Sequence, residues 1–207
     1  MKKSRRITAE DRRRRILEAA GDLFLKNGYA STSLNDIIRL AGGSKATLVA
    51  QFGDKAGLFA AVLESPAVEF ARNLTAPPAE PPEITLQRFG EAILRFYLLP
   101  SALLAYRGVI AAGPENPEIA RAFYERAHQR IVAPVAKQLR HWHQRGVLAD
   151  VDFHAEADRF THMLRSGIYE QRLLGAIERT RSAQISQHVN AAVRTFLRGL
   201  NHDPNGT

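Results

Sequence analysis

Hydrophobic residues recur at intervals of three and four along most of this chain, which is the spacing of amphipathic α-helices. One such stripe joins Ile16, Ala20, Leu23 and Phe24, which fall on the same helical face. Glycine, proline and capping residues separate the apolar stripes from one another. The pattern predicts an all-α fold of about nine helices. The predicted helices span about residues 8–26, 33–41, 45–51, 84–98, 101–112, 118–145, 153–174 and 182–200, and one more begins at residue 54 and is interrupted at Ser65-Pro66.

The stretch from Thr32 to Leu58 carries the strongest start and stop signals in the chain. Ser33 and Asp36 have the spacing of a capping box, which opens a short helix. Gly42-Gly43 ends that helix, because glycine takes the positive φ that a tight corner between helices needs. Ser44 can then cap a second short helix from Lys45. Two short helices joined by a glycine turn are typical of a helix-turn-helix, whose second helix lies in the DNA major groove.

The distribution of charge supports this interpretation. Of the 207 residues, the first 55 contain 12 Lys/Arg and 6 Asp/Glu, whereas the remaining 152 contain 17 and 15. The excess of positive charge therefore lies with the helix-turn-helix, where neutralising phosphates would supply affinity for DNA. The chain has no cysteine, which excludes disulfides and fits a reducing cytoplasm. No window approaches 18 uninterrupted apolar residues, so we expect no membrane span.

A set of residues at fixed spacing extends the helix-turn-helix signal in both directions. It comprises Ile16-Leu17-Glu18-Ala19-Ala20, Leu23-Phe24, Gly28-Tyr29, Thr32-Ser33-Leu34, Asp36-Ile37, Ala41-Gly42, Ser44-Lys45, Thr47-Leu48, Phe52, Asp54-Lys55 and Leu58-Phe59. Over about residues 12 to 63 the chain resembles the tetracycline-repressor (TetR) family of bacterial transcriptional regulators. The run 117–126 is similar to the effector domain of one subgroup of that family. The resemblance implies a DNA-binding domain over residues 1–53 and a helical ligand-binding and dimerisation domain over residues 54–207.

Four positions depart from the family pattern. Val49 and Gln51 stand where the family usually has aromatic residues, so the tyrosine hydroxyl that typically reaches a phosphate is missing at Val49. Ile38 is large where the family prefers a small residue, and Gly43 is small where it prefers valine. We interpret this pair as a volume swap that keeps the small core packed.

The predicted DNA contacts lie in the arm and around the second helix of the motif. They are Arg5, Arg6, Ser33, Ser44, Lys45, Ala46, Thr47, Gln51 and Lys55. Lys45 can donate to guanine or to a phosphate, and Gln51 can pair with adenine if it faces the groove. Ser33 and Lys55 lie near helix N-termini, which favour phosphates. Basic arms in this family enter the minor groove, although a solvated tail that adds nonspecific attraction is equally compatible with Arg5 and Arg6.

The resemblance also implies a homodimer in which the last two helices pair with the same helices of a second subunit. Operator geometry agrees, because two reading helices must meet successive major grooves about 34–36 Å apart. The predicted interface residues are Phe160, Leu164, Gly167, Ile168, Val189, Ala192, Val193 and Phe196. Packing of the same helix faces within one subunit is the alternative, since any amphipathic helix must bury its apolar side.

An unidentified small-molecule effector, apolar or aromatic, is a further implication of the resemblance. Its predicted contacts are Phe96, Tyr97, Tyr106, Arg107, Phe123, Tyr124, His128, Trp142, Met163, Arg165 and Tyr169. The alternative for each apolar residue is plain core packing. Arg107, His128 and Arg165 would orient a ligand or pair with acidic side chains.

Other chemistry finds little support in the sequence. His154, Asp158 and His162 share one helical face at ligand-like spacing, but no fourth ligand can be named, so we predict no metal site and no cofactor. No nucleophile triad or glycine-rich phosphate loop can be found, which argues against an enzyme. The predicted function is a cytoplasmic, nucleoid-associated, sequence-specific regulator, most simply a homodimeric repressor released from its operator by a ligand. The alternative is a constitutive or architectural DNA-binding protein without an effector.

Overall fold

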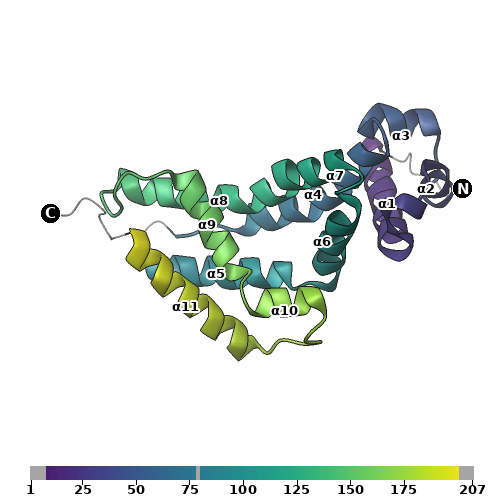
Figure 1. Ribbon diagram of the computed structural model, residues 1–207. Coiled ribbons are helices and arrows are strands. Elements are labelled where there is room, and N and C mark those ends of the chain that lie inside the picture. Colours follow the sequence, from purple (N-terminus) through teal and green to yellow (C-terminus); the bar gives the residue numbers. More distant parts are fainter. Residues whose placement is uncertain (1–7, 78–79, 201–207) are drawn as a thin grey trace, which may run out of the picture. The chain divides into compact units, whose positions relative to one another are not determined.

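The computed structural model describes residues 8–77 and 80–200, and within these ranges the chain forms helices and no strands (Figure 1). The predicted all-α fold is therefore confirmed. The helices are α1 (Ala9–Ser31), α2 (Leu34–Ala41), α3 (Lys45–Phe52), α4 (Lys55–Asn73), α5 (Pro82–Tyr97), α6 (Pro100–Ala112), α7 (Pro117–Ala122), the π-helical segment η1 (Phe123–His128), α8 (Gln129–Gln144), α9 (Phe153–Leu164), α10 (Ile168–Leu174) and α11 (Ser182–Leu200).

The helices are divided between two units. Unit 1 consists of Met1–Pro66 and Leu104–Ala127, and unit 2 consists of Ala67–Leu103 and His128–Thr207. Helices α4 and α6 contribute residues to both units. The sequence predicts that the DNA-binding domain ends at residue 53. These two units are defined by packing and not by DNA binding, so that boundary stays a prediction.

Unit 1 begins with the capped helices that the sequence predicts. Thr8 Oγ1 accepts a hydrogen bond from the Asp11 amide at 3.0 Å, and Ser33 Oγ accepts one from the Asp36 amide at 3.1 Å. In both cases the acidic side chain also accepts from the backbone of the capping residue, so both capping boxes are complete. Gly42 and Gly43 have φ of 75° and 107°, which makes the tight corner between α2 and α3. The helix-turn-helix is therefore present as expected.

The core of unit 1 confirms the predicted stripe of α1. Ile16, Ala20 and Phe24 are buried together with Ile37 of α2 and Leu48 of α3. Gly43 does not take part in this packing, because a Cβ there would meet nothing within 4 Å. Its positive φ explains the glycine, and the predicted volume swap with Ile38 is therefore wrong.

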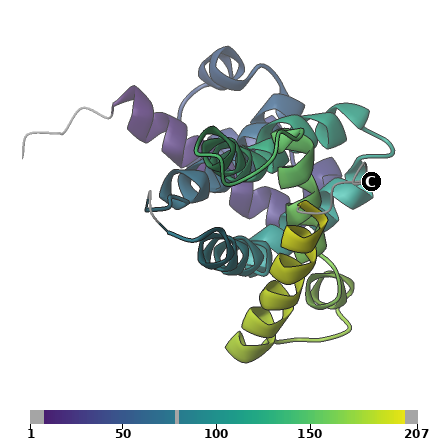
Figure 2. The same cartoon turned by 90° about the vertical axis from the view of Figure 1, so that its left-hand side faces the viewer.

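Unit 2 is built around α5, α8, α9 and α11. Helix α11 packs on α5 and α9, and α8 packs on α9 (Figures 1 and 2). The approach of α5 to α11 is close at Gly90, where a Cβ would lie 2.7 Å from Val189 Cγ1. Phe160 and Leu164 of α9 fill the space beside this contact and are fully buried.

Helix α1 extends to Ser31 rather than ending at about residue 26, and three other predicted helices are broken or continuous where the sequence predicts otherwise. The segment 118–145 is not one α-helix, because η1 separates α7 from α8, while Pro134 lies within α8. The segment 153–174 is broken into α9 and α10, where Gly167 has φ of 60°. Helix α4 continues through Pro66 as one element.

None of the helices in the described ranges is by itself long and apolar enough to cross a membrane, although two bent helix pairs meet those criteria jointly.

Candidate nucleic-acid interface

The second helix of the motif, α3, presents one side to the core and the other to solvent. Leu48 is fully buried against unit 1. Lys45, Ala46, Val49 and Ala50 are exposed. The open side of α3 therefore carries one cation followed by small apolar side chains, which is a surface that can enter a groove without bulky obstruction.

The start of α3 is fixed by Ser44. Its Oγ accepts a hydrogen bond from the Thr47 amide at 3.2 Å and lies 3.0 Å from Thr47 Oγ1. The two hydroxyls thus interact with each other, and the capped end keeps its remaining N–H groups pointing out of the helix. Ser44, Lys45 and Thr47 are brought together at the terminus where an anion is favoured.

Ser33 has a comparable role at the start of α2. Its hydroxyl donates to Asp36 Oδ2 at 2.6 Å, and Asp36 also forms an ion pair with Arg39. These interactions, the Ser33 hydroxyl first, hold the pKa of Asp36 below its ordinary value. The hydroxyl of Ser33 is therefore engaged in capping, and a phosphate at this terminus would meet backbone N–H groups as well.

Lys55 links the start of α4 to the last turn of α1. Its Nζ donates to the Ala30 carbonyl at 3.1 Å and lies 4.3 Å from the centroid of the Tyr29 ring. Partial burial lowers the pKa of Lys55. An ammonium group has three N–H donors, so these contacts leave donors for a phosphate. Lys55 thus combines a bracing role, which the sequence did not predict, with the predicted charge.

The remaining predicted contacts differ in their surroundings. Gln51 is half-buried, and its Oε1 is shielded from solvent without a hydrogen-bond partner in the structure. Its carbonyl oxygen therefore faces the protein interior. Arg5 and Arg6 lie outside the described residues. Arg13 is not among the predicted contacts, and its guanidinium lies 4.6 Å from the centroid of the Phe52 ring at the end of α3.

The predicted ligand residues are divided between the two units. Unit 1 contains Tyr106, Arg107, Phe123 and Tyr124, and unit 2 contains Phe96, Tyr97, His128, Trp142, Met163, Arg165 and Tyr169. In unit 1 the rings of Tyr106 and Phe123 lie 5.4 Å apart. In unit 2 the structure brings together Tyr97, His128, Arg165 and Tyr169. Arg165 Nη2 lies 2.9 Å from His128 Nδ1 and 3.5 Å from the Tyr97 hydroxyl, and the Tyr97 and Tyr169 rings are 5.7 Å apart.

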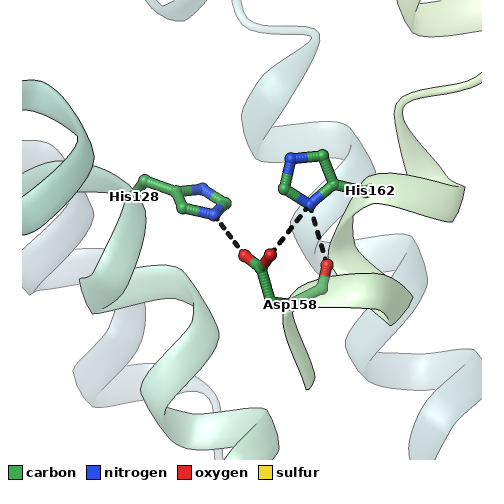
Figure 3. A group of neighbouring side chains, drawn as sticks. All are labelled: His128, Asp158 and His162. Carbon is green, nitrogen blue, oxygen red and sulfur yellow. Dashed lines mark hydrogen bonds and ion pairs between the residues drawn. The ribbon is translucent and has the colours of Figure 1, made fainter. Parts of the chain in front are cut away.

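A second group of polar side chains continues from His128. His128 Nε2 lies 2.7 Å from Asp158 Oδ1, and His162 Nδ1 lies 3.5 Å from Asp158 Oδ2 (Figure 3). Burial is the main cause that lowers the pKa of His128, and burial raises the pKa of Tyr97. His154, which shares the predicted helical stripe, is instead placed at the α9 N-terminus, where Asp152 accepts from its amide at 3.1 Å.

The predicted dimer residues have a clear location. Phe160, Leu164, Val189, Ala192, Val193 and Phe196 are buried in the core of unit 2, whereas Gly167 is exposed and Ile168 is half-buried. The buried six pack within their own subunit, which corresponds to the intramolecular alternative. The position of a dimer interface stays a prediction.

The chain combines a capped helix-turn-helix, whose second helix is open to solvent, with further helices in the same polypeptide. This is the architecture of helix-turn-helix DNA-binding regulators. The profile of bacterial regulatory proteins of the tetR family matches residues 16–62. The profile of the AefR-like transcriptional repressor C-terminal domain matches residues 84–199, which is more than half of the chain. The chain belongs to the TetR family of bacterial transcriptional regulators.

Individual relatives agree with this assignment. The structure of the flavonoid-responsive regulator FrrA is 27% identical, with a TM-score of 0.77 over 96% of this chain and 100% of that chain. A TetR-family regulator from Mesorhizobium loti is also 27% identical, with a TM-score of 0.76 over 92% of this chain and 96% of that chain. The transcriptional repressor ComR of Escherichia coli is 42% identical over 64 residues, which are 31% of this chain and only 30% of ComR.

Proposed function

We propose that this chain is a homodimeric repressor that binds an operator through α3 and leaves it when a small molecule binds to the helical part that follows. The observation that carries the proposal is the open face of α3, with Lys45 exposed at a helix N-terminus that Ser44 caps. The excess of positive charge in the first 55 residues supports the same role. Such a protein would act in the cytoplasm, on chromosomal DNA.

The composition of that face indicates how it would discriminate between sequences. Lys45 can donate to guanine O6 and N7, whereas Ala46 and Val49 can only make apolar contacts, for which the thymine methyl is the partner in the major groove. Val49 is 43% exposed, so this contact requires no rearrangement of α3. We therefore expect an operator half-site that combines a guanine with neighbouring thymines.

We infer dimerisation and release by an effector from the behaviour of the TetR family, and two features support them here. A single short helix-turn-helix contacts one half-site, so two copies are needed to read adjacent major grooves. FrrA is described as flavonoid-responsive. The paired aromatic residues of unit 2, such as Tyr97 with Tyr169, are suited to an apolar or aromatic effector. The effector would favour a subunit arrangement with the wrong spacing between reading helices.

Footprinting of the promoter beside its own gene, with and without metabolite extract, tests the proposal. In quantitative binding to the protected site, Lys45→Ala should change the preference among base pairs at one position. Lys55→Ala should weaken binding to all sequences and reduce the salt slope by about 1, because it removes about one phosphate contact. Lys137→Ala, an exposed lysine of α8, is the matched control and should behave as wild type.

The results also separate the alternatives. A chain that is monomeric in sedimentation and indifferent to duplex DNA at moderate salt would refute the proposal. A site-specific dimer that no extract releases would instead support a constitutive DNA-binding protein. If Lys45→Ala and Lys55→Ala lost sequence preference equally, the division of roles between base and phosphate would be wrong.

A further inference from the structure

The polar cluster of His128, Asp158 and His162 in unit 2 lies outside the helix-turn-helix and has the composition of a metal site (Figure 3). We propose that these three side chains bind a divalent transition-metal ion such as Zn²⁺, and that the ion displaces Arg165 from His128. The proposal does not depend on the proposed repressor function, because metal binding can be measured without DNA.

The ligand atoms already lie close together. One atom from each side chain, an imidazole nitrogen or a carboxylate oxygen, lies within 4.8 Å of the other two. Bonds of about 2.0–2.2 Å in a tetrahedral zinc site place ligand atoms about 3.4 Å apart. The cluster therefore needs only small side-chain adjustments to close around an ion.

The fold holds the three side chains in place from two packed elements. Asp158 and His162 are one turn apart on α9, so they point to the same side of that helix. His128 is the last residue of η1, and α8, which follows it directly, packs on α9. Single π-helical turns occur frequently at functional sites, because they redirect side chains relative to the regular helix.

Exposure increases across the cluster and leaves a route for the ion. The side chain of His128 is 1% exposed, that of Asp158 is 26% exposed and that of His162 is 49% exposed. An ion would enter past His162 and bind between the Asp158 carboxylate and the buried imidazole. Solvent on the His162 side can supply the fourth ligand, which corresponds to an open zinc site with three protein ligands.

The donor set favours one class of metal. Two imidazoles and one carboxylate suit zinc, nickel, cobalt or copper, whereas magnesium and calcium prefer sites made of oxygen ligands. We therefore expect binding of Zn²⁺ and Co²⁺ and no measurable competition by millimolar Mg²⁺.

Two hydrogen bonds set the cost of binding. His162 Nδ1 donates to the Asp158 carbonyl at 2.9 Å and must give up that bond if it is to bind the ion. Arg165 holds His128 through the second bond. A guanidinium nitrogen can only donate, so Nδ1 of His128 accepts at 2.9 Å and the neutral ring carries its proton on Nε2. Nε2 is the atom that faces Asp158 and would bind the metal. A neutral imidazole has only one free lone pair, so a metal at Nε2 requires the proton on Nδ1, where it clashes with the Arg165 donor. Metal binding and the Arg165–His128 bond therefore exclude each other.

The experiment uses the full chain, with any affinity tag removed, titrated with Co²⁺ and Zn²⁺ in equilibrium dialysis against a chelating dye. We expect one ion per chain, with Co²⁺ giving the visible spectrum of a site with nitrogen and oxygen ligands. His162→Ala should weaken binding at least tenfold. His154→Ala is the matched control, because it removes an exposed histidine of the same helix that lies outside the cluster, and it should bind as wild type. Circular dichroism verifies that both variants are folded.

Arg165→Gln tests whether the ion displaces Arg165 from His128. Glutamine removes the positive charge and the fixed donor, so we expect metal binding to become several-fold tighter. No binding at about 100 µM Zn²⁺, or equal losses in His162→Ala and His154→Ala, would overturn the site. Unchanged or weaker binding by Arg165→Gln would overturn the displacement of Arg165.

Discussion

Gly90 provides the sharpest test of the packing in unit 2. It lies within α5, where the chain passes so close to α11 and α9 that there is no room for a methyl group. A Cβ at this position would lie 2.7 Å from Val189 Cγ1, 3.3 Å from Leu164 Cδ2 and 3.4 Å from Phe160 Cζ. All three neighbours are fully buried, so none can swing out into solvent. We predict that Gly90→Ala destabilises unit 2.

Two opposing effects determine how much Gly90→Ala changes the free energy of unfolding. Alanine is favoured over glycine within a helix by about 1 kcal/mol. Forcing an extra methyl into a packed core costs about 1–3 kcal/mol, and a distance below 3.0 Å to a stiff β-branched side chain places the cost at the upper end of that range. The net expectation is a loss of about 1–2 kcal/mol in the free energy of unfolding. Steric overlap therefore prevails over helix propensity.

Urea unfolding followed by Trp142 fluorescence is the appropriate assay. Trp142 is the only tryptophan of the chain and is buried in α8, so its signal reports on unit 2. Gly199→Ala is the matched control in α11, because a Cβ there meets nothing within 4 Å, and it should be neutral or slightly stabilising. In a double-mutant cycle, Val189→Ala should relieve part of the cost of Gly90→Ala. If Gly90→Ala were as stable as wild type, α5 and α11 could not approach as closely as described.

Two further predictions concern unit 1. The fold lowers the pKa of Asp36 from its ordinary value of 3.8. The ionised Asp36 carboxylate therefore stabilises the folded state above pH 3.8, and this stabilisation is lost as the pH falls through the lower pKa of the folded state. Asp36→Asn should therefore be less stable than wild type at pH 7, and the gap should close on acidification in thermal melts. Ile38→Ala should cost about 1–2 kcal/mol, since Ile38 is partly buried against the core, and a neutral result in urea unfolding would contradict that packing.

The local features of unit 1 could be predicted because each one depends on neighbours in sequence. Thr8 with Asp11 and Ser33 with Asp36 are three residues apart, so a capping box is visible without any knowledge of tertiary structure. The turn at Gly42-Gly43 likewise requires positive φ, which is a conformation that glycine favours whatever its tertiary surroundings. These signals, together with the apolar stripe of α1, were sufficient to place the helix-turn-helix.

The same reasoning failed where distant contacts decide the outcome. The predicted role of Gly43 as a volume compensation was wrong, because the space around a residue depends on which helices pack there. The sequence did not predict the break between α9 and α10, because apolar residues keep their helical spacing on both sides of Gly167. The positive φ of Gly167, which interrupts the helix, cannot be seen in that spacing. The bracing contact of Lys55 with Ala30 joins residues 25 positions apart, and no local pattern indicates it.

The polar cluster of unit 2 shows where sequence periodicity stops being informative. Helical spacing correctly pairs Asp158 with His162, but it adds His154, which the structure places at the N-terminus of α9 and outside the cluster. The third member is His128, which lies 30 residues before Asp158, and only the packing of α8 on α9 brings it within 2.7 Å of that carboxylate. Arg165, the residue that directly follows α9, then fixes the tautomer of His128. A search for ligands along one helix therefore finds only two of the three side chains of such a site, because a metal selects side chains by distance in space and by the lone pairs that their other partners leave available.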